Sequence, residues 1–227
     1  QSRVKKTRLN VWCRNNDLRK MKVVKQMQNY VSVLLSNVDS LSNKFMELQL
    51  LLGSAKTLPD LILLNEVNPK NLRFPQSISE YQLKGWQILS SGFQKDGCRG
   101  LLLYYKESLS VIEINMKITF QEKLCIRLLT SRDFLNILFI YRSPNSLSEN
   151  NELLIDLLEE FMLLKGNHLL LGDFNFPEIN WMTSSCQGLH TRIENRFLKF
   201  LDDRFMIQHI TEPTRFRPGQ TPHLLDL

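Results

Sequence analysis

The sequence predicts one α/β domain in which two sheets, mainly antiparallel, pack against each other and helices cover their outer faces. Two observations lead to this prediction. About nine or ten short apolar segments have the length and the bounding turn residues of strands, and further segments carry apolar residues at helical spacing. The chain has 227 residues, enough to bury a large core. It contains no repeat, low-complexity stretch or linker, so a single domain accounts for it.

The positive charge of the chain is concentrated near its N-terminus. Residues 1–25 hold nine Lys and Arg against one acid, Asp17, whereas the remainder holds 20 basic and 22 acidic residues. The net charge of +6 is therefore the property of a basic arm, taken as residues 1–27, and the domain is assigned to 28–227. Such an arm suits nucleic acid, and it is equally typical of a solvated, flexible tail.

A strand, a helix and a second strand are expected to open the domain. The apolar segment 30–35 is the first strand. Apolar residues at helical spacing run from Leu41 to Leu52, and Gly53 marks the end of that helix. Residues 60–64 form a second buried strand, which completes a βαβ-like unit.

The next part of the sequence predicts a meander of antiparallel strands, because apolar segments alternate there with polar or Gly-containing turns. The expected strands are 86–90, 100–105, 109–115, 124–130 and 135–141.

Two helices and further strands follow the meander. Ser148 is expected to cap an amphipathic helix, and the apolar run 169–171 is a buried strand. The segment 191–194, Thr-Arg-Ile-Glu, has the pattern of a capping box that opens another helix. A strand is expected near 207–210, and a new strand begins at 223–227.

The most informative stretch is Leu-Leu-Leu-Gly-Asp-Phe-Asn at 169–175. The side chains of Asp173 and Asn175 point to the same face if the strand continues. A carboxylate and an amide at the mouth of a buried strand are unfavourable unless they hold a metal, a water or a substrate. The alternative is a strand that ends in an Asx-turn, since both residue types favour turns.

Other polar residues share this position at or near the end of an apolar strand. Strand ends of a layered α/β protein can converge on one rim, and carboxylates gathered there require a divalent cation. Oxygen ligands without paired Cys or His favour Mg²⁺, Mn²⁺ or Ca²⁺ over zinc, which points to phosphate-ester hydrolysis. The residues in question are Asn37, Asp39, Glu66, Tyr141, Asn145 and Asp226.

Cysteine spacing and hydropathy indicate an intracellular protein without a membrane partner. The four cysteines are far apart and form no C-x-x-C pair, which predicts reduced thiols. No apolar stretch is long enough to span a membrane, and no signal peptide follows the first basic residues.

The polar motifs, in their order along the chain, resemble those of the endonuclease/exonuclease/phosphatase superfamily. They are Asn-Val-Asp-Ser-Leu at 37–41, Asn-Glu at 65–66, Gly-Asp-Phe-Asn at 172–175 and Leu-Asp-Leu at 225–227. Within this superfamily the chain is most similar to the endonuclease domains of non-LTR retrotransposons. The stretches that carry this narrower likeness are 141–146, 172–181 and 212–215. The resemblance implies a four-layered α/β sandwich.

The resemblance also implies a metal site. Glu66 would be the main metal ligand and Asp39 a second ligand, with Mg²⁺ as the cofactor and Mn²⁺ as a possible substitute. Asn37 would help to position the metal and the phosphate. Asp39 has an alternative role, because Asp-Ser before a helix is also a good N-cap signal.

Further roles follow from the same resemblance. Asp173 would orient or deprotonate the attacking water, and Asn175 would hold the water or the phosphate in line. Tyr141 and Asn145 would contact the phosphate, although the spacing from Tyr141 departs from the family's motif by one residue. Asp226 matches the acid that orients a catalytic histidine.

Three residues are candidate DNA contacts: Arg142, Arg215 and Trp181. Arg215 lies in a basic loop that suits phosphate contact, and a solvated loop is the alternative. Trp181 could stack on a base, and packing in the core is the alternative.

The family's closing Ser-Asp-His motif does not occur in this sequence, which ends at Leu227 and does not begin with Met. We therefore expect a C-terminally truncated piece of a longer protein. Because the histidine stabilises charge that develops on the phosphate, the 227 residues alone should have little or no nuclease activity.

The function expected from these observations is that of a Mg²⁺-dependent endonuclease domain of a non-LTR retrotransposon. It would hydrolyse one DNA phosphodiester bond and leave a 3′-hydroxyl, which an adjoining reverse transcriptase domain would extend in the nucleus. Two alternatives stay open. One is a phosphatase of the same fold, and the other is an inactive remnant that only binds nucleic acid.

Overall fold

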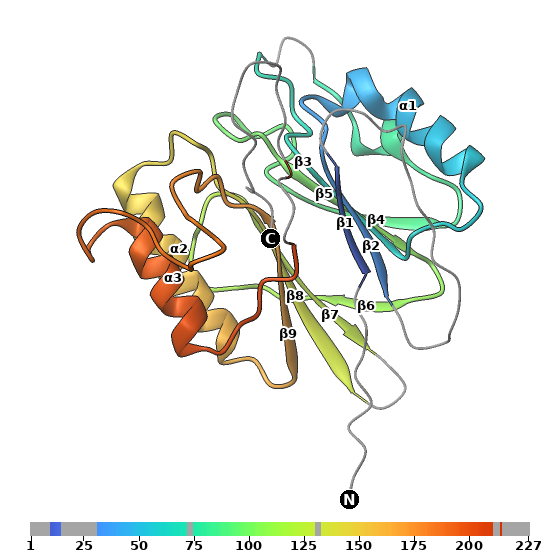
Figure 1. Ribbon diagram of the computed structural model, residues 1–227. Coiled ribbons are helices and arrows are strands. Elements are labelled where there is room, and N and C mark those ends of the chain that lie inside the picture. Colours follow the sequence, from blue (N-terminus) through green and yellow to red (C-terminus); the bar gives the residue numbers. More distant parts are fainter. Residues whose placement is uncertain (1–9, 15–30, 72–74, 130–132, 211–213, 215–227) are drawn as a thin grey trace, which may run out of the picture.

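Two β-sheets pack face to face in the computed structural model of the chain, and helices cover the outer face of each sheet (Figure 1). The structure describes residues 10–14, 31–71, 75–129, 133–210 and 214. The order of layers is helix, sheet, sheet and helices. This order confirms the four-layered α/β sandwich. Four of the seven strand pairings among the described residues are antiparallel.

The first sheet has the strand order β1-β2-β3-β5-β4. Its strands β1, β2 and β3 are parallel, and α1 connects β2 to β3 in the predicted βαβ unit. Strand β5 runs antiparallel to both β3 and β4. The elements are β1 (Asn10–Arg14), β2 (Ser32–Asn37), α1 (Leu41–Ser54), β3 (Leu61–Asn65), the 3₁₀ helix η1 (Ile78–Tyr81), β4 (Trp86–Ser91) and β5 (Leu101–Lys106).

The second sheet has the strand order β6-β7-β8-β9. The first two pairings are antiparallel, as the meander predicts, and β8 and β9 are parallel because α2 connects them. Helices α2 and α3 lie together on the outer face of this sheet (Figure 1). The elements are β6 (Ser110–Glu113), β7 (Lys123–Leu129), β8 (Phe134–Tyr141), α2 (Ser148–Met162), β9 (Asn167–Asp173) and α3 (Ile193–Asp203).

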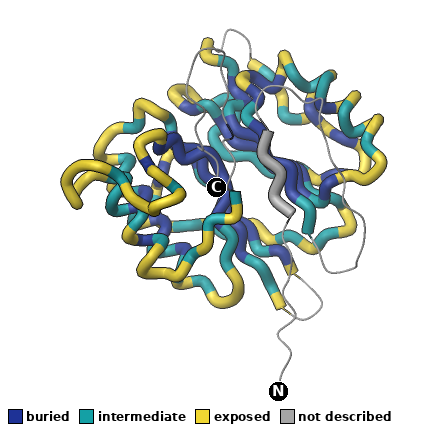
Figure 2. The backbone as a smooth tube through the Cα atoms, in the orientation of Figure 1, coloured by how far each residue is buried: buried dark blue, intermediate teal, exposed yellow. Residues whose placement is uncertain are grey.

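Strand β3 shows how one strand supplies two apolar layers. Leu61 and Leu63 pack between the sheets, where Ile137 of β8 also lies. Ile62 and Leu64 pack on the other face of β3, against α1. This alternation follows from the two-residue period of a strand. Figure 2 shows the result as dark blue strands inside a teal and yellow exterior.

The expected basic arm contains a strand. Strand β1 lies within residues 1–27 and pairs in parallel with β2. The reason is local: Val-Trp-Cys at 11–13 has high strand propensity and lies between more polar residues. The rest of the arm lies outside the described residues, so its flexibility stays a prediction.

Both expected helix caps are wrong in detail. Leu147 is the N-cap of α2 and Arg192 is the N-cap of α3, and neither helix has a side-chain cap hydrogen bond. Ser148 is instead the first residue of α2. The carboxylate of Glu194, which a capping box would use, pairs with the Arg192 side chain at 3.2 Å.

The strand expected near 207–210 is also wrong. These residues have no regular structure, and Ile207, whose burial would hold such a strand against the core, is 76% exposed. The strand expected at 223–227 lies outside the described residues. No helix among the residues that the structure describes is long and apolar enough to cross a membrane.

Candidate active site

The loops that follow β2 and β3 are joined by backbone hydrogen bonds beyond the ends of the strands. The Val38 N–H donates to the Asn65 carbonyl at 3.0 Å, and the Ser40 N–H donates to the Glu66 carbonyl at 2.8 Å. These bonds hold Asp39 beside Glu66. Both residues have positive φ, 40° for Asp39 and 56° for Glu66. Such conformations are unfavourable for side-chain-bearing residues and occur often at functional sites.

The Glu66 carboxylate is the centre of the polar cluster. Its Oε1 accepts from Asn37 Nδ2 at 2.6 Å and from the Tyr141 hydroxyl at 3.2 Å. Its Oε2 accepts from Arg99 Nη2 at 2.6 Å and from Arg99 Nε at 3.1 Å. Asn37 and Arg99 belong to the first sheet and its loops, whereas Tyr141 ends β8 of the second sheet. Glu66 therefore lies where the two sheets meet.

Arg99 also joins Glu66 to Asp39. The same Nη2 atom contacts Asp39 Oδ1, and Lys70 Nζ lies 3.7 Å from that oxygen. The Glu66 and Arg99 side chains are 18% and 17% exposed, whereas Asp39 is 54% exposed. The Arg99 guanidinium thus offsets part of the repulsion between two carboxylates that it holds near one another.

Tyr141 connects this cluster to Asp173. The two residues are register partners in the β8–β9 ladder, and the Tyr141 hydroxyl reaches Glu66. Burial, together with the negative charges of Glu66 and Asp173, raises the pKa of Tyr141 above its ordinary value. The phenol therefore remains a hydrogen-bond donor at neutral pH. The structure brings Glu66 and Asp173 to the same edge of the molecule, as the strand-end argument predicts.

Asp173 and Asn175 form a tight turn at the end of β9. The Asn175 N–H donates to Asp173 Oδ1 at 3.2 Å, and Asn175 Nδ2 donates to the Arg142 carbonyl at 2.8 Å. Asn175 has a φ of 50°, which asparagine tolerates better than most residues. Both side chains are buried. The Asx-turn and the gathering of polar groups are therefore both present.

Arg142, expected to contact DNA, is engaged within the protein, which favours a structural role for it. Its side chain is buried, and its guanidinium donates to the carbonyls of Phe174 and Asn175 at 3.2 and 3.0 Å. It also lies over the Phe176 ring, 4.4 Å from the ring centroid. A buried guanidinium needs such partners, so Arg142 fixes the loop that carries Asn175.

Glu122 is a buried acid near the site that the sequence did not single out. Its carboxylate accepts hydrogen bonds from the backbone N–H groups of Gly100 and Arg99. Burial is the main reason that its pKa rises to about 7, and the charge of Glu66 adds to this rise. Polar residues that follow apolar strands mark the site in the sequence. Glu122 was missed because it directly precedes β7.

The structure gives less support to the remaining candidate residues, Trp181, Asn145, Arg215 and Asp226. Trp181 packs against the apolar cluster of α2 and α3, which favours its packing role over stacking on a base. Asn145 is exposed in the turn after β8, where its N–H donates to Ser143 Oγ at 3.3 Å. Arg215 and Asp226 lie outside the described residues.

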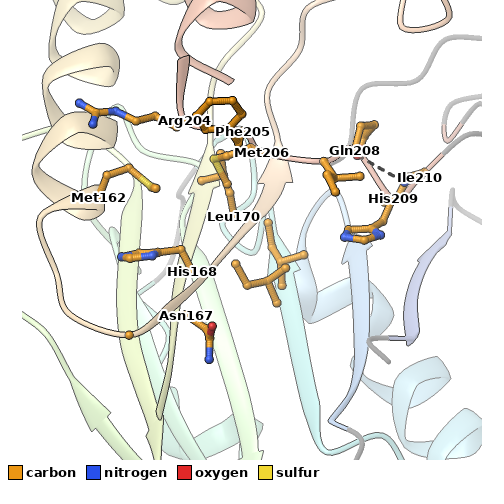
Figure 3. Close-up of a pocket in the computed structure, with 14 residues that line it drawn as sticks. Met162, Asn167, His168, Leu170, Arg204, Phe205, Met206, Gln208, His209 and Ile210 are labelled. Carbon is orange, nitrogen blue, oxygen red and sulfur yellow. Dashed lines mark hydrogen bonds between the residues drawn. The ribbon is translucent and has the colours of Figure 1, made fainter. Parts of the chain in front are cut away.

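A pocket lies elsewhere, along the N-terminal part of β9 (Figure 3). It has a volume of about 350 Å³ and is lined by β9 and residues 204–210. The side chains of His168, Gln208 and His209 lie around it. None of the candidate site residues lines this pocket, so the pocket is separate from the cluster around Glu66.

The donor set at Glu66 fits a hard divalent cation. One nitrogen of Arg99 touches an oxygen of both Glu66 and Asp39, so these two oxygens can share a single ligand. Carboxylate and amide oxygens are the ligands that Mg²⁺ and Mn²⁺ prefer. Groups of three or more His, Cys, Asp or Glu suited to a metal are absent from the described part of the chain. Two carboxylates are a common protein contribution to a Mg²⁺ site, whose other ligands are usually water and phosphate.

Comparisons with solved structures show proteins of similar fold. The endonuclease domain of TRAS1, a telomere-specific non-LTR retrotransposon, matches with a TM-score of 0.55 and 13% identity, over 86% of this chain and 81% of that chain. An AP endonuclease from Leishmania major matches with a TM-score of 0.53 and 13% identity, over 75% and 66%. D. rerio TDP2 complexed with a single-strand DNA product matches with a TM-score of 0.52 and 14% identity, over 86% and 81%.

The chain therefore shares the four-layered α/β fold of these nucleases, in agreement with the fold that the motifs imply. Residues 135–227 match the family model described as endonuclease-reverse transcriptase, so this part of the chain is similar to that family. The curated proteins include no match to the sequence.

Proposed function

We propose that the chain is a Mg²⁺-dependent DNA endonuclease domain of the non-LTR retrotransposon type. The observation that supports it best is the contact of the Glu66 carboxylate with groups from both sheets, beside Asp173. In this proposal the domain cuts one DNA strand and leaves a 3′-hydroxyl. An adjoining reverse transcriptase domain, suggested by the family match over 135–227, would use that end as a primer.

Glu66 and Asp39 would hold the metal, with Asn37 orienting the Glu66 carboxylate through its 2.6 Å hydrogen bond. The bound ion would supply a Lewis acid that offsets negative charge on the phosphate. In this proposal Asp173 would accept a proton from the attacking water, and Asn175 would orient that water. Attack of this water on phosphorus breaks the bond to the 3′ oxygen, which leaves as the hydroxyl.

Tyr141 has a positioning role in this proposal. Its hydroxyl donates to Glu66, and its raised pKa keeps the proton in place at neutral pH. Tyr141 belongs to the second sheet, and its hydroxyl thus helps to orient the Glu66 carboxylate, which follows β3 of the first sheet. A direct contact between Tyr141 and the phosphate would require the hydroxyl to leave Glu66.

A nicking assay tests the proposed function. Supercoiled circular DNA is incubated with excess protein and Mg²⁺, and slow conversion to nicked circles is expected, because the sequence contains no Ser-Asp-His motif. EDTA and Glu66→Gln should abolish nicking. The control variant Glu113→Gln removes an exposed acid on β6 and should leave the rate unchanged. Extension of the nicks by a DNA polymerase then detects the 3′-hydroxyl.

Two outcomes would contradict the proposal. Salt-dependent DNA binding, with neither Mg²⁺-dependent nicking nor binding of Mg²⁺ or Mn²⁺, would indicate a nucleic-acid-binding remnant. Hydrolysis of inositol phosphates or phospholipids in a substrate panel, with DNA left intact, would indicate a phosphatase of the same fold.

A further inference from the structure

Arg99 occupies the position between the two proposed metal ligands. Its Nη2 atom lies 2.6 Å from Glu66 Oε2 and also contacts Asp39 Oδ1. One positively charged nitrogen thus touches one oxygen of each carboxylate. A divalent ion shared by these oxygens would take the place of that nitrogen, because both cations use the same two acceptors.

The backbone of Arg99 is held firmly, so only its side chain is free to move away. The Arg99 carbonyl accepts from the Asn68 N–H at 2.7 Å. The next residue, Gly100, donates its N–H to Glu122. A Cβ at Gly100 would lie 2.8 Å from Val67 Cγ2, which shows how closely this backbone approaches the loop that follows β3.

The Arg99 guanidinium is not fully satisfied where it lies. Its Nη1 atom is buried and has no hydrogen-bond partner among the described residues. A buried N–H group without a partner is unfavourable. A new acceptor at this edge, such as a phosphate oxygen, would therefore gain from an Arg99 side chain that turns toward it. Guanidinium groups bind phosphate well because their donors match two of its oxygens.

We infer that Arg99 is an internal counter-cation that a divalent metal must displace from Glu66 and Asp39, and that the displaced guanidinium then binds the DNA phosphate. This inference rests on the proposed function. It predicts opposite effects of removing Arg99: metal binding becomes tighter, and DNA binding in the presence of metal becomes weaker. A purely structural role for Arg99 would weaken both.

Mn²⁺ binding, measured by calorimetry on the full chain without DNA, tests the first effect. Arg99→Gln should bind Mn²⁺ about tenfold more tightly than the wild type, a typical size for coupling between sites. The control Arg196→Gln removes a cation from α3, where it pairs with Glu152, and should leave Mn²⁺ affinity unchanged. If Arg99→Gln fails to fold, Arg99→Met, which keeps an unbranched side chain without the charge, decides: tighter Mn²⁺ binding supports the inference, and unchanged or weaker binding overturns it.

Fluorescence anisotropy with a short DNA duplex in saturating Mn²⁺, read before cleavage, tests the second effect. Arg99→Gln should bind the duplex several-fold more weakly than Arg196→Gln, which has the same net charge. Equal DNA affinity of the two variants would overturn the part of the inference that concerns phosphate.

Failure of this inference is distinguishable from failure of the proposed function. If Glu66→Gln loses Mn²⁺ binding but Arg99→Gln binds Mn²⁺ no more tightly than the wild type, only the role of Arg99 is overturned. If folded Glu66→Gln binds Mn²⁺ as the wild type does, the metal site at Glu66 is itself wrong.

Discussion

At the scale of single residues, the candidate site contains acids that are removed from water. Hydrogen-bond donors of the protein compensate for the lost hydration of their carboxylates. Glu66 accepts from Asn37, Tyr141 and Arg99, whereas Glu122 accepts from the backbone near Gly100. Neutral backbone donors compensate burial less than a paired cation does. Burial raises the pKa of Glu122 to about 7, so Glu122 should titrate near neutrality.

The stability of the protein should fall as pH rises from about 4.5 to about 7, because the pKa of Glu122 rises to about 7 in the folded state. In this window the folded state binds a proton that the unfolded state has released, so raising the pH favours unfolding. The effect is on the order of 3 kcal/mol at most. Glu66 and Arg99 are the charged groups that face Glu122.

Urea unfolding at several pH values checks this prediction. The free energy of unfolding of Glu122→Gln, measured relative to the wild type, should increase from pH 5 to pH 7.5. Parallel pH profiles for the two proteins would mean that Glu122 does not titrate in this range.

At the scale of secondary-structure elements, the close pairing of β8 and β9 determines where Asp173 lies. Gly172 has a φ of 141°, and a Cβ built on it would lie 1.8 Å from the Ile140 carbonyl oxygen. Only glycine fits this approach of the two strands. The glycine before the Asp-Phe-Asn sequence is therefore a requirement of the β8–β9 ladder.

Gly172→Ala should lower the free energy of unfolding by at least about 3 kcal/mol, since the methyl group forces β8 and β9 apart. Gly53→Ala is the matched control, because nothing lies within 4 Å of its added Cβ and Gly53 belongs to α1. It should raise the stability by up to about 1 kcal/mol. Equal effects of the two substitutions in urea unfolding would contradict the close approach at Gly172.

The elements were largely predictable, whereas part of the site was not. Apolar segments on described residues became strands or helices within a few residues of their expected bounds, except at 207–210 and in the arm. The missed site residues share one physical cause. Arg99 precedes β5 and Glu122 precedes β7, and both strands run antiparallel to a neighbour that ends at the site. The search for polar groups after strands could not find them.

At the scale of the whole molecule, the candidate site depends on the packing of the two sheets. Glu66, Asn37 and Arg99 come from the first sheet and its loops, whereas Tyr141 and Asp173 come from the second. The apolar layer between the sheets includes Tyr141 itself. A change in how the sheets pack would therefore separate the Tyr141 hydroxyl from Glu66 and dismantle the cluster.

Paramagnetic broadening of backbone amide NMR signals by Mn²⁺ tests this convergence most directly. With substoichiometric Mn²⁺, the signals of Glu66 and Asn37 in the first sheet and of Tyr141 and Asp173 in the second should broaden together. The signal of Gly53 in α1 should stay sharp. Broadening confined to one sheet, or absent at Glu66, would contradict a single metal-binding site formed by both.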